Sequence, residues 1–144
     1  MYWPQTPVSY SSQSSVLSAV EMGDAADNWN AIQSKIAFQP ADQDLDVLAY
    51  DDNTLQNAYG LTQIYSQSCN SGCIGQINEC TGACMDALTI YYVNIAMDAT
   101  DITTYAHFYG EFPGEFATSV AAHELGHTLR VSRGLLGKME NENA

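Results

Sequence analysis

The sequence predicts an α+β protein, in which an N-terminal helix and a C-terminal helix enclose a series of strands. Three observations support this prediction. Apolar residues recur at helical spacing over residues 16–36, short apolar and β-branched runs follow between residues 36 and 97, and a second helical pattern begins near Glu115. We find no internal repeat and no long linker, so we expect one domain over residues 1–144, with an atypical tail over residues 130–144.

The first predicted elements are a short strand and a long amphipathic helix. The strand covers Val8 to Tyr10, and Ser14 or Ser15 is a suitable N-cap for the helix that follows. We expect the apolar stripe of this helix, including Trp29, to pack in the core rather than to bind a ligand. The stripe consists of Val16, Val20, Ala25 or Ala26, Trp29 and Ile32.

The middle of the chain predicts four further strands. Two are short, over residues 36–40 and 45–50, and each is closed by turn-forming residues. A third covers residues 59–66, and the run over residues 87–97 is apolar on both faces, which is typical of a central strand. We expect residues 98–114 to form a loop or a short helix before the helix that begins near Glu115.

Three aspartates alternate between the two short strands, as they do at the start of a calcium-binding loop. Asp42, Asp44 and Asp46 have this spacing, but Val47 stands where a glycine should make the sharp turn and Asn53 where a glutamate should close the site. We therefore interpret the segment as a solvated acidic turn.

The charge of the chain excludes several classes of partner. It has 17 Asp and Glu against 4 Lys and Arg, which gives a net charge of -13. This charge repels nucleic acid and anionic lipid, so we expect neither as a partner. No run approaches the roughly 18 apolar residues of a membrane-spanning helix, and the first residues lack the pattern of a secretory signal.

Four cysteines lie close together in a segment that is rich in Gly, Asn and Ser. They are Cys69, Cys73, Cys80 and Cys84. Disulfides are favoured over a second zinc site or free thiols, because the spacing is unusual for zinc and the composition suggests an oxidising compartment. We therefore expect a secreted, extracellular and monomeric protein, whose signal peptide is not present in this chain.

The C-terminal helical pattern contains two histidines four positions apart, in the sequence His123-Glu124-Leu125-Gly126-His127. On a helix these imidazoles lie about 40° apart on one face, so both can reach one ion. We expect His123 and His127 to bind Zn²⁺ and to leave a water molecule on the ion, with a pKa lowered to about 7. Glu124 would then accept the proton of that water and pass it to the departing amine.

The helical pattern also predicts which way the apolar residues of this helix point. Phe116 and Val120 would form an apolar floor under the metal, whereas Ala121, Leu125 and Leu129 would face the core. The competing interpretation of the motif is a buried helix whose histidines only form hydrogen bonds. His107, the third histidine, is interpreted as a surface or packing residue.

The stretch from Ser119 to Leu129 resembles the active-site helix of metzincin zinc proteases, and of matrixin-like bacterial peptidases in particular. The order of the preceding elements is also similar. The resemblance implies a twisted mixed sheet with an N-terminal packing helix and an active-site helix. It also implies that residues 59–66 form the edge strand, with which a peptide substrate pairs, that His123 and His127 are zinc ligands, and that Glu124 is the base.

The chain departs from the family pattern after the second histidine. The pattern continues with a glycine and a third histidine, but Arg130 and Arg133 stand at these positions. A guanidinium stays protonated and cannot bind zinc. The family's turn methionine has only a weak counterpart in Met139, whose flanking residues differ.

Three explanations of the missing ligand remain open. Residues 130–144 are the foreign or frame-shifted end of a truncated protease gene, or Glu140, Glu142 or the terminal carboxylate completes the site, or the protein binds peptides without cutting them. The first is favoured, because three of the four basic residues follow Leu129.

We therefore predict a zinc-dependent endopeptidase that acts on a peptide or protein substrate. The alternatives are a catalytically inactive metzincin-like module that binds peptides and, with less support, an acidic disulfide-stapled structural protein in which the motif is accidental.

Overall fold

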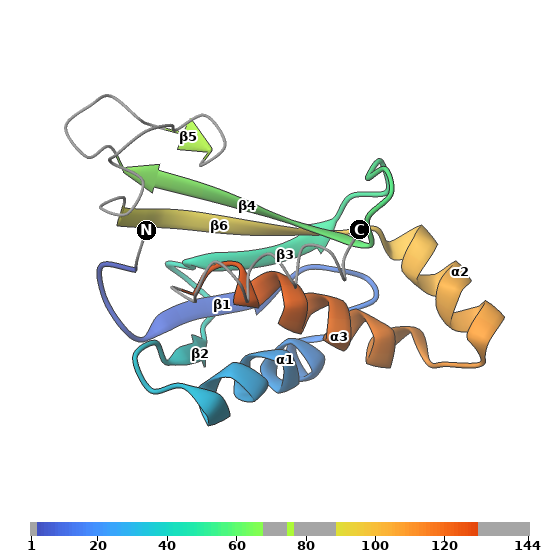
Figure 1. The fold of residues 1–144 in the computed structure, drawn as a ribbon, viewed down its shortest axis with the longest axis horizontal. Coiled ribbons are helices and arrows are strands. Elements are labelled where there is room, and N and C mark those ends of the chain that lie inside the picture. The colour runs from blue at the N-terminus through green and yellow to red at the C-terminus, as the bar shows by residue number, and fades with distance from the viewer. Residues whose placement is uncertain (1–2, 68–74, 77–88, 130–144) are drawn as a thin grey trace.

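The computed structural model describes residues 3–67, 75–76 and 89–129, which form one mixed sheet and three helices (Figure 1). The α+β class is therefore confirmed. In chain order the elements are β1 (Val8–Ser12), α1 (Ala19–Ile32), β2 (Phe38–Pro40), β3 (Val47–Asp51), β4 (Gly60–Gln67), β5 (Gly75–Gln76), β6 (Thr89–Met97), α2 (Ala99–Tyr109) and α3 (Pro113–Gly126).

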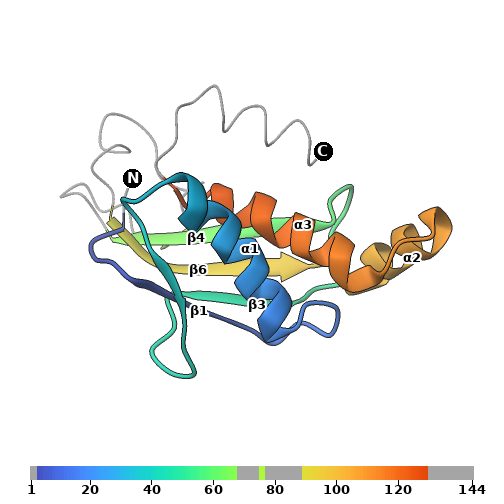
Figure 2. The same cartoon turned by 90° about the horizontal axis from the view of Figure 1, so that it is seen from below.

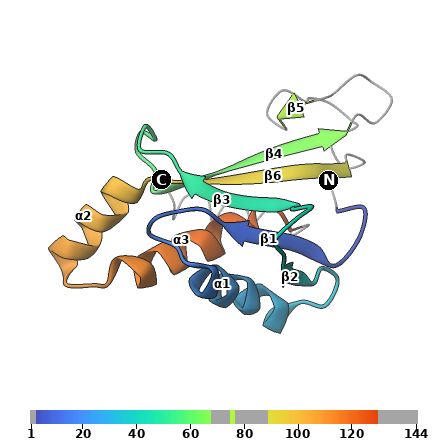
Figure 3. The same cartoon turned by 180° about the vertical axis from the view of Figure 1, so that it is seen from behind.

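The strands of the sheet are arranged in the order β2-β1-β3-β6-β4-β5, with β3 and β1 nearest the viewer in Figure 3. The first four are mutually parallel, whereas β4 runs antiparallel to both β6 and β5. β6 lies between β3 and β4, as predicted for the central strand. Ile95, Ala96 and Met97 are all fully buried, so the end of β6 is covered on both faces.

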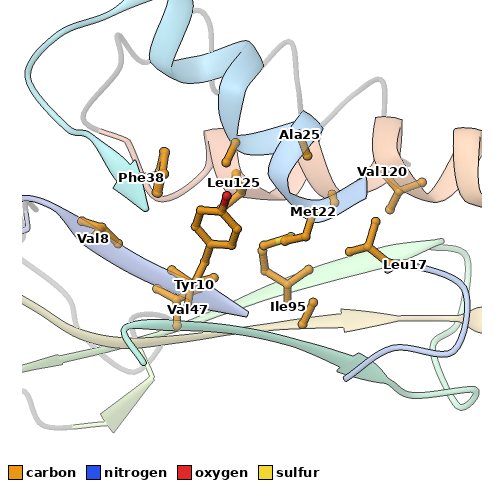
Figure 4. Close-up of a cluster of buried hydrophobic side chains, with 14 of the residues drawn as sticks. Val8, Tyr10, Leu17, Met22, Ala25, Phe38, Val47, Ile95, Val120 and Leu125 are labelled. Atoms are coloured by element: carbon orange, nitrogen blue, oxygen red, sulfur yellow. The ribbon is translucent and has the colours of Figure 1, made fainter. Parts of the chain in front are cut away.

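Helices α1 and α3 lie side by side on one face of the sheet, while α2 lies beyond one end of it (Figure 2). The core fills the space between this helical layer and the strands. Figure 4 shows Met22 and Ala25 of α1 and Leu125 of α3 directed towards the side chains of the sheet. The strand residues that meet them include Val8, Tyr10, Val47 and Ile95.

The N-terminal end of α1 differs from the prediction. The N-cap is Ser18, whose hydroxyl accepts a hydrogen bond from the backbone N–H of Glu21, while the Glu21 carboxylate accepts one from the N–H of Ser18. This reciprocal pair satisfies two N–H groups at the helix start, whereas the side chain of a lone serine cap would satisfy one. The helix therefore begins after Ser18 rather than after Ser14 or Ser15. Ser14 and Ser15 instead donate hydrogen bonds to the carboxylate of Asp51.

The predicted apolar stripe of α1 was also partly wrong. Val20 and Ile32 are 75% and 72% exposed, and the buried face is centred on Met22, Ala25 and Ala26. The helix begins three residues later than predicted, at Ala19, and therefore turns a different set of side chains towards the sheet. Trp29 is partly buried and packs against the core, as expected.

The segment after β2 contains the three alternating aspartates. Asp42 and Asp44 are exposed, which agrees with a solvated turn. Asp46 has a structural role, because its carboxylate accepts hydrogen bonds from the N–H and the hydroxyl of Ser9 at 2.9 and 3.2 Å. These hydrogen bonds connect the segment between β2 and β3 to β1.

Residues 98–114, predicted as a loop or a short helix, contain the 11-residue helix α2. Asp98 caps its first turn, and Gly110 ends it with a left-handed backbone at a φ of 69°, a conformation that favours glycine. Within the part of the chain that the structure describes, no helix has the length and hydropathy needed to cross a bilayer.

Candidate metal centre

The motif lies at the C-terminal end of α3, a helix of 14 residues that starts with Pro113 at its first position. His123 and Glu124 lie in the last turn, and His127 is the C-cap residue with helical backbone angles. The N–H of His127 donates to the carbonyl oxygen of Glu124 at 3.1 Å, so a tighter turn continues the helix. The two histidines therefore keep helical spacing.

The structure brings the two imidazoles and the carboxylate together. Each of His123, Glu124 and His127 offers one ligand atom, and these atoms all lie within 4.8 Å of one another. The imidazole centroids are 5.0 Å apart and the rings are inclined by 74°. Both imidazoles are partly exposed, although the Nε2 atom of His123 is buried. Converging nitrogen donors are the ligands that zinc prefers.

Glu124 is almost fully buried, with an exposed fraction of 1%, and its side chain is directed towards β4. The hydroxyl of Thr62 lies within hydrogen-bond distance of Oε2 of Glu124 and, at 2.9 Å, of its backbone carbonyl oxygen. Because a hydroxyl carries one proton, Thr62 shares its donor between these two acceptors.

Gly60 allows β4 to approach α3 closely at this point. A Cβ atom at this position would lie 2.7 Å from Cγ1 of Val120 and 3.0 Å from Cγ of Glu124. Any side chain would therefore push the helix away from the strand. Gly60, Thr62 and Ile64 alternate along β4 and turn the same face towards the helices.

Sequence reasoning missed both Gly60 and Thr62. A glycine at the start of a strand pattern was a signal for a close backbone approach. Thr62, however, gave no such signal, since its role depends on a helix that lies 62 residues further along the chain.

The predicted apolar floor is only partly correct. Val120 is 5% exposed and belongs to the same core cluster as Ala121, Leu125 and Leu129, which were assigned to the opposite face. The reason is that α3 packs against both α1 and the sheet, so its buried face is wider than one stripe.

Phe116 belongs instead to an aromatic cluster near the start of β4. Its ring centroid lies 4.2 Å from that of Tyr105 and 5.0 Å from that of Tyr59. Burial raises the pKa of Tyr59, and the neighbouring Tyr105 and Asp101 raise it further. A cavity of about 600 Å³ opens beside the cluster and is lined by Asn57, Ala58, Tyr59, Asp101, Thr104, Tyr105, Phe108 and Tyr109.

Trp29 of α1 contacts α3 at Ala122, away from the contact with β4. Its indole Nε1 donates a hydrogen bond of 2.6 Å to the carbonyl oxygen of Ala122, the residue before His123. No sequence pattern indicated this contact. The motif is thus held at Ala122 from α1 and at Glu124 from β4.

The remaining predicted residues lie apart from the centre. His107 is exposed on α2, as expected for a surface residue. Within the described ranges, His123, Glu124 and His127 are the one group of three or more metal-binding side chains. Several predictions lie outside the described residues: those on Cys69, Cys73, Cys80 and Cys84, and those on Arg130, Arg133, Met139, Glu140 and Glu142.

Strand β4, predicted as the edge of the sheet, is the next to last strand, because β5 pairs with it at Tyr65 and Ser66. From Gly60 to Ile64, β4 has one strand partner among the described residues, which is β6.

Comparisons with protein-family models, with curated proteins and with solved structures find no match to this chain. We therefore base the functional proposal on the geometry of the centre.

Proposed function

We propose that the protein is a zinc-dependent endopeptidase in which His123 and His127 hold the metal and Glu124 acts as the catalytic base. The observation that carries the proposal is the convergence of these three side chains within 4.8 Å at the partly exposed end of α3.

The donor set fits zinc. Imidazole nitrogens bind Zn²⁺ at about 2.0–2.1 Å, and catalytic sites leave a position open for water or substrate. When bound, zinc would polarise the carbonyl of the scissile peptide bond and acidify a water molecule. Both histidines come from one rigid helix, so their separation is set by the backbone rather than by a loop.

Glu124 has the position that proton transfer requires. Its ligand atom lies within 4.8 Å of those of both imidazoles, near enough to accept a proton from a water molecule between them. As the water oxygen bonds to the carbonyl carbon, its proton passes to Glu124. When the carbon–nitrogen bond breaks, Glu124 returns this proton to the departing amine.

The outer edge of β4 is the proposed place for the substrate. In this part of β4, Gly60 lies close to Val120 and Glu124 of α3. An extended peptide can add to such an edge through backbone hydrogen bonds, which recognise any sequence. A mixed sheet with α1 and α3 on one face is consistent with the proposed metzincin-like fold. We also propose that the protein acts outside the cell on peptide or protein chains.

One observation favours a second function, a peptide-binding module without catalytic activity. The chain has three histidines, and the third, His107, is exposed and lies outside the group that holds the metal. Two histidines bind zinc more weakly than three, since each lost ligand removes binding energy. Such a module would use the same edge of β4.

Cleavage of casein by the zinc-supplemented protein separates these functions. We expect Glu124→Gln to reduce turnover by about 10²- to 10⁴-fold, because it removes the base, while zinc content stays unchanged. Glu115→Gln is the matched control, since Glu115 is an exposed glutamate of the same helix. Equal cleavage by the wild type and by Glu124→Gln would exclude the endopeptidase and favour the binding module.

A further inference from the structure

We propose that Thr62 is a positioning residue, which holds the Glu124 carboxylate in the orientation that proton transfer needs. This inference rests on the proposed function. Its basis is the pair of contacts that the Thr62 hydroxyl makes, with Oε2 of Glu124 and with the backbone carbonyl oxygen of the same residue at 2.9 Å. One side chain from β4 thereby contacts both ends of Glu124.

The carboxylate contact is the specific part of this arrangement. The carbonyl oxygen of Glu124 already accepts a hydrogen bond from the N–H of His127, so it does not depend on Thr62. A buried carboxylate, in contrast, gains much from a hydroxyl donor, since hydrogen bonds to ionised groups are about twice as strong as neutral ones. The Thr62 hydroxyl therefore does more than donate a hydrogen bond to a backbone carbonyl group of α3.

Glu124 needs such a contact because a glutamate side chain has three rotatable bonds. Its conformational freedom has to be removed before the reaction if the carboxylate is to face the water molecule. Fixing Oε2 against Thr62 sets the plane of the carboxylate, and so sets the direction of Oε1. Oε1 lies 3.3 Å from the position that a Cβ on Gly60 would occupy.

Thr62 is well suited to this role by its place in the sheet. Its β-branched side chain has few rotamers, and its backbone pairs with Ile95 of β6, which is fully buried. Gly60, two residues earlier on the same face, lets α3 approach closely. The hydroxyl is thus presented from a strand that pairs with the central strand β6, rather than from a loop.

The first test does not depend on cleavage. We would measure the side-chain order parameter of Glu124 by carbon-13 relaxation in the full chain, with and without zinc. In the wild type and in Thr62→Ser we expect a value near 0.8, whereas in Thr62→Val the value falls below about 0.6, because the hydroxyl is lost. Thr62→Ala serves the same purpose if the valine variant does not fold.

The control is Thr118→Val. Thr118 lies on α3 and its hydroxyl also donates to a backbone carbonyl oxygen, that of Gly114. We expect this variant to leave the order of Glu124 unchanged. If Thr62→Val, or Thr62→Ala in its place, keeps the wild-type order parameter, the proposal is overturned.

The second test is kinetic. Thr62→Val should lower kcat by about 10- to 100-fold with little change in KM, and Thr62→Ser should recover most of the loss, because misplacement of a catalytic group affects the reaction step. An unchanged kcat would also overturn the proposal. If the wild type shows no Glu124-dependent cleavage, the endopeptidase itself is wrong, and the order parameter alone decides whether Thr62 holds Glu124.

Discussion

The carboxylates of Asp51 and Glu124 both accept hydrogen bonds from hydroxyl groups in another part of the chain, but their surroundings differ. Asp51, at the end of β3, lies near the surface and accepts hydrogen bonds from the hydroxyls of Ser14 and Ser15 at 2.6 and 2.5 Å. The N–H of Ser15 adds a bond of 3.0 Å. Glu124 is buried in α3, contacts Thr62, and has an imidazole on either side of it in the sequence.

We propose that the difference separates a structural carboxylate, Asp51, from a catalytic one, Glu124. Asp51 joins the segment before α1 to the end of β3, so its bonds order the backbone between two elements. The hydroxyl near Glu124 holds the side chain of a residue whose neighbours can bind a metal. Changes at Asp51 should therefore alter stability and leave chemistry intact, whereas changes around Glu124 should alter both.

The largest expected effect on stability comes from Gly60→Ala. The new Cβ would meet Val120 at 2.7 Å and Glu124 at 3.0 Å, and Val120 is buried in the core cluster. We expect the free energy of unfolding to fall by about 1–3 kcal/mol, as for overpacked cores. Chemical denaturation measures this change. A matching loss of Glu124-dependent cleavage is expected, since β4 and α3 are forced apart.

Gly23→Ala is the control for this prediction. Gly23 lies inside α1, and an added Cβ would make an ordinary contact of 3.5 Å with the Tyr10 hydroxyl. Alanine is the better helix former, so we expect a gain of about 0.5–1 kcal/mol. If both alanine variants changed stability equally, the close approach of β4 to α3 would be contradicted.

A smaller effect is expected at Asp51. Burial raises the pKa of this carboxyl, but the hydrogen bonds from Ser14 and Ser15 outweigh burial and place the pKa below the ordinary value of 3.8. The folded state therefore gains stability from these bonds above pH 3.8 and loses it as the pH falls through the lowered pKa. The double variant Ser14→Ala, Ser15→Ala should be less stable by about 1 kcal/mol at neutral pH, since the site is partly exposed.

The measurement is urea unfolding of the wild type and the double variant at several pH values. The difference between them should be constant near neutral pH and should shrink below about pH 4. Cleavage per folded molecule should stay the same. A deficit that does not change with pH, or a loss of cleavage, would contradict the division between the two carboxylates.

The sequence predicted the strands and α3 well because their patterns are locally complete. The four strands after α1 that were predicted are all present, with bounds shifted by at most two residues. The start of α1 was misplaced because several serines precede it. The pair Ser18 and Glu21, three positions apart, is the pattern that marks the true start.

The residues of the candidate site also form two groups, those whose pattern is local in the sequence and those whose contacts depend on the fold. The convergence of His123, Glu124 and His127 was predictable because the two histidines lie about one helical turn apart. Thr62, Gly60 and Trp29 were not, since their contacts with α3 depend on how the helix docks against β4 and α1. Such contacts link residues 62 and 93 positions apart, and no local periodicity reports them.

The most direct test of the central claim is the zinc content of the purified protein and its histidine variants. After equilibration with Zn²⁺ and removal of excess metal, we expect roughly one zinc per chain in the wild type and the same in His107→Ala, whose side chain lies on exposed α2. His123→Ala and His127→Ala should each lose most of the metal, because each removes one of the two imidazole donors. Zinc retained in full by both variants, or absent from the wild type, would contradict the account.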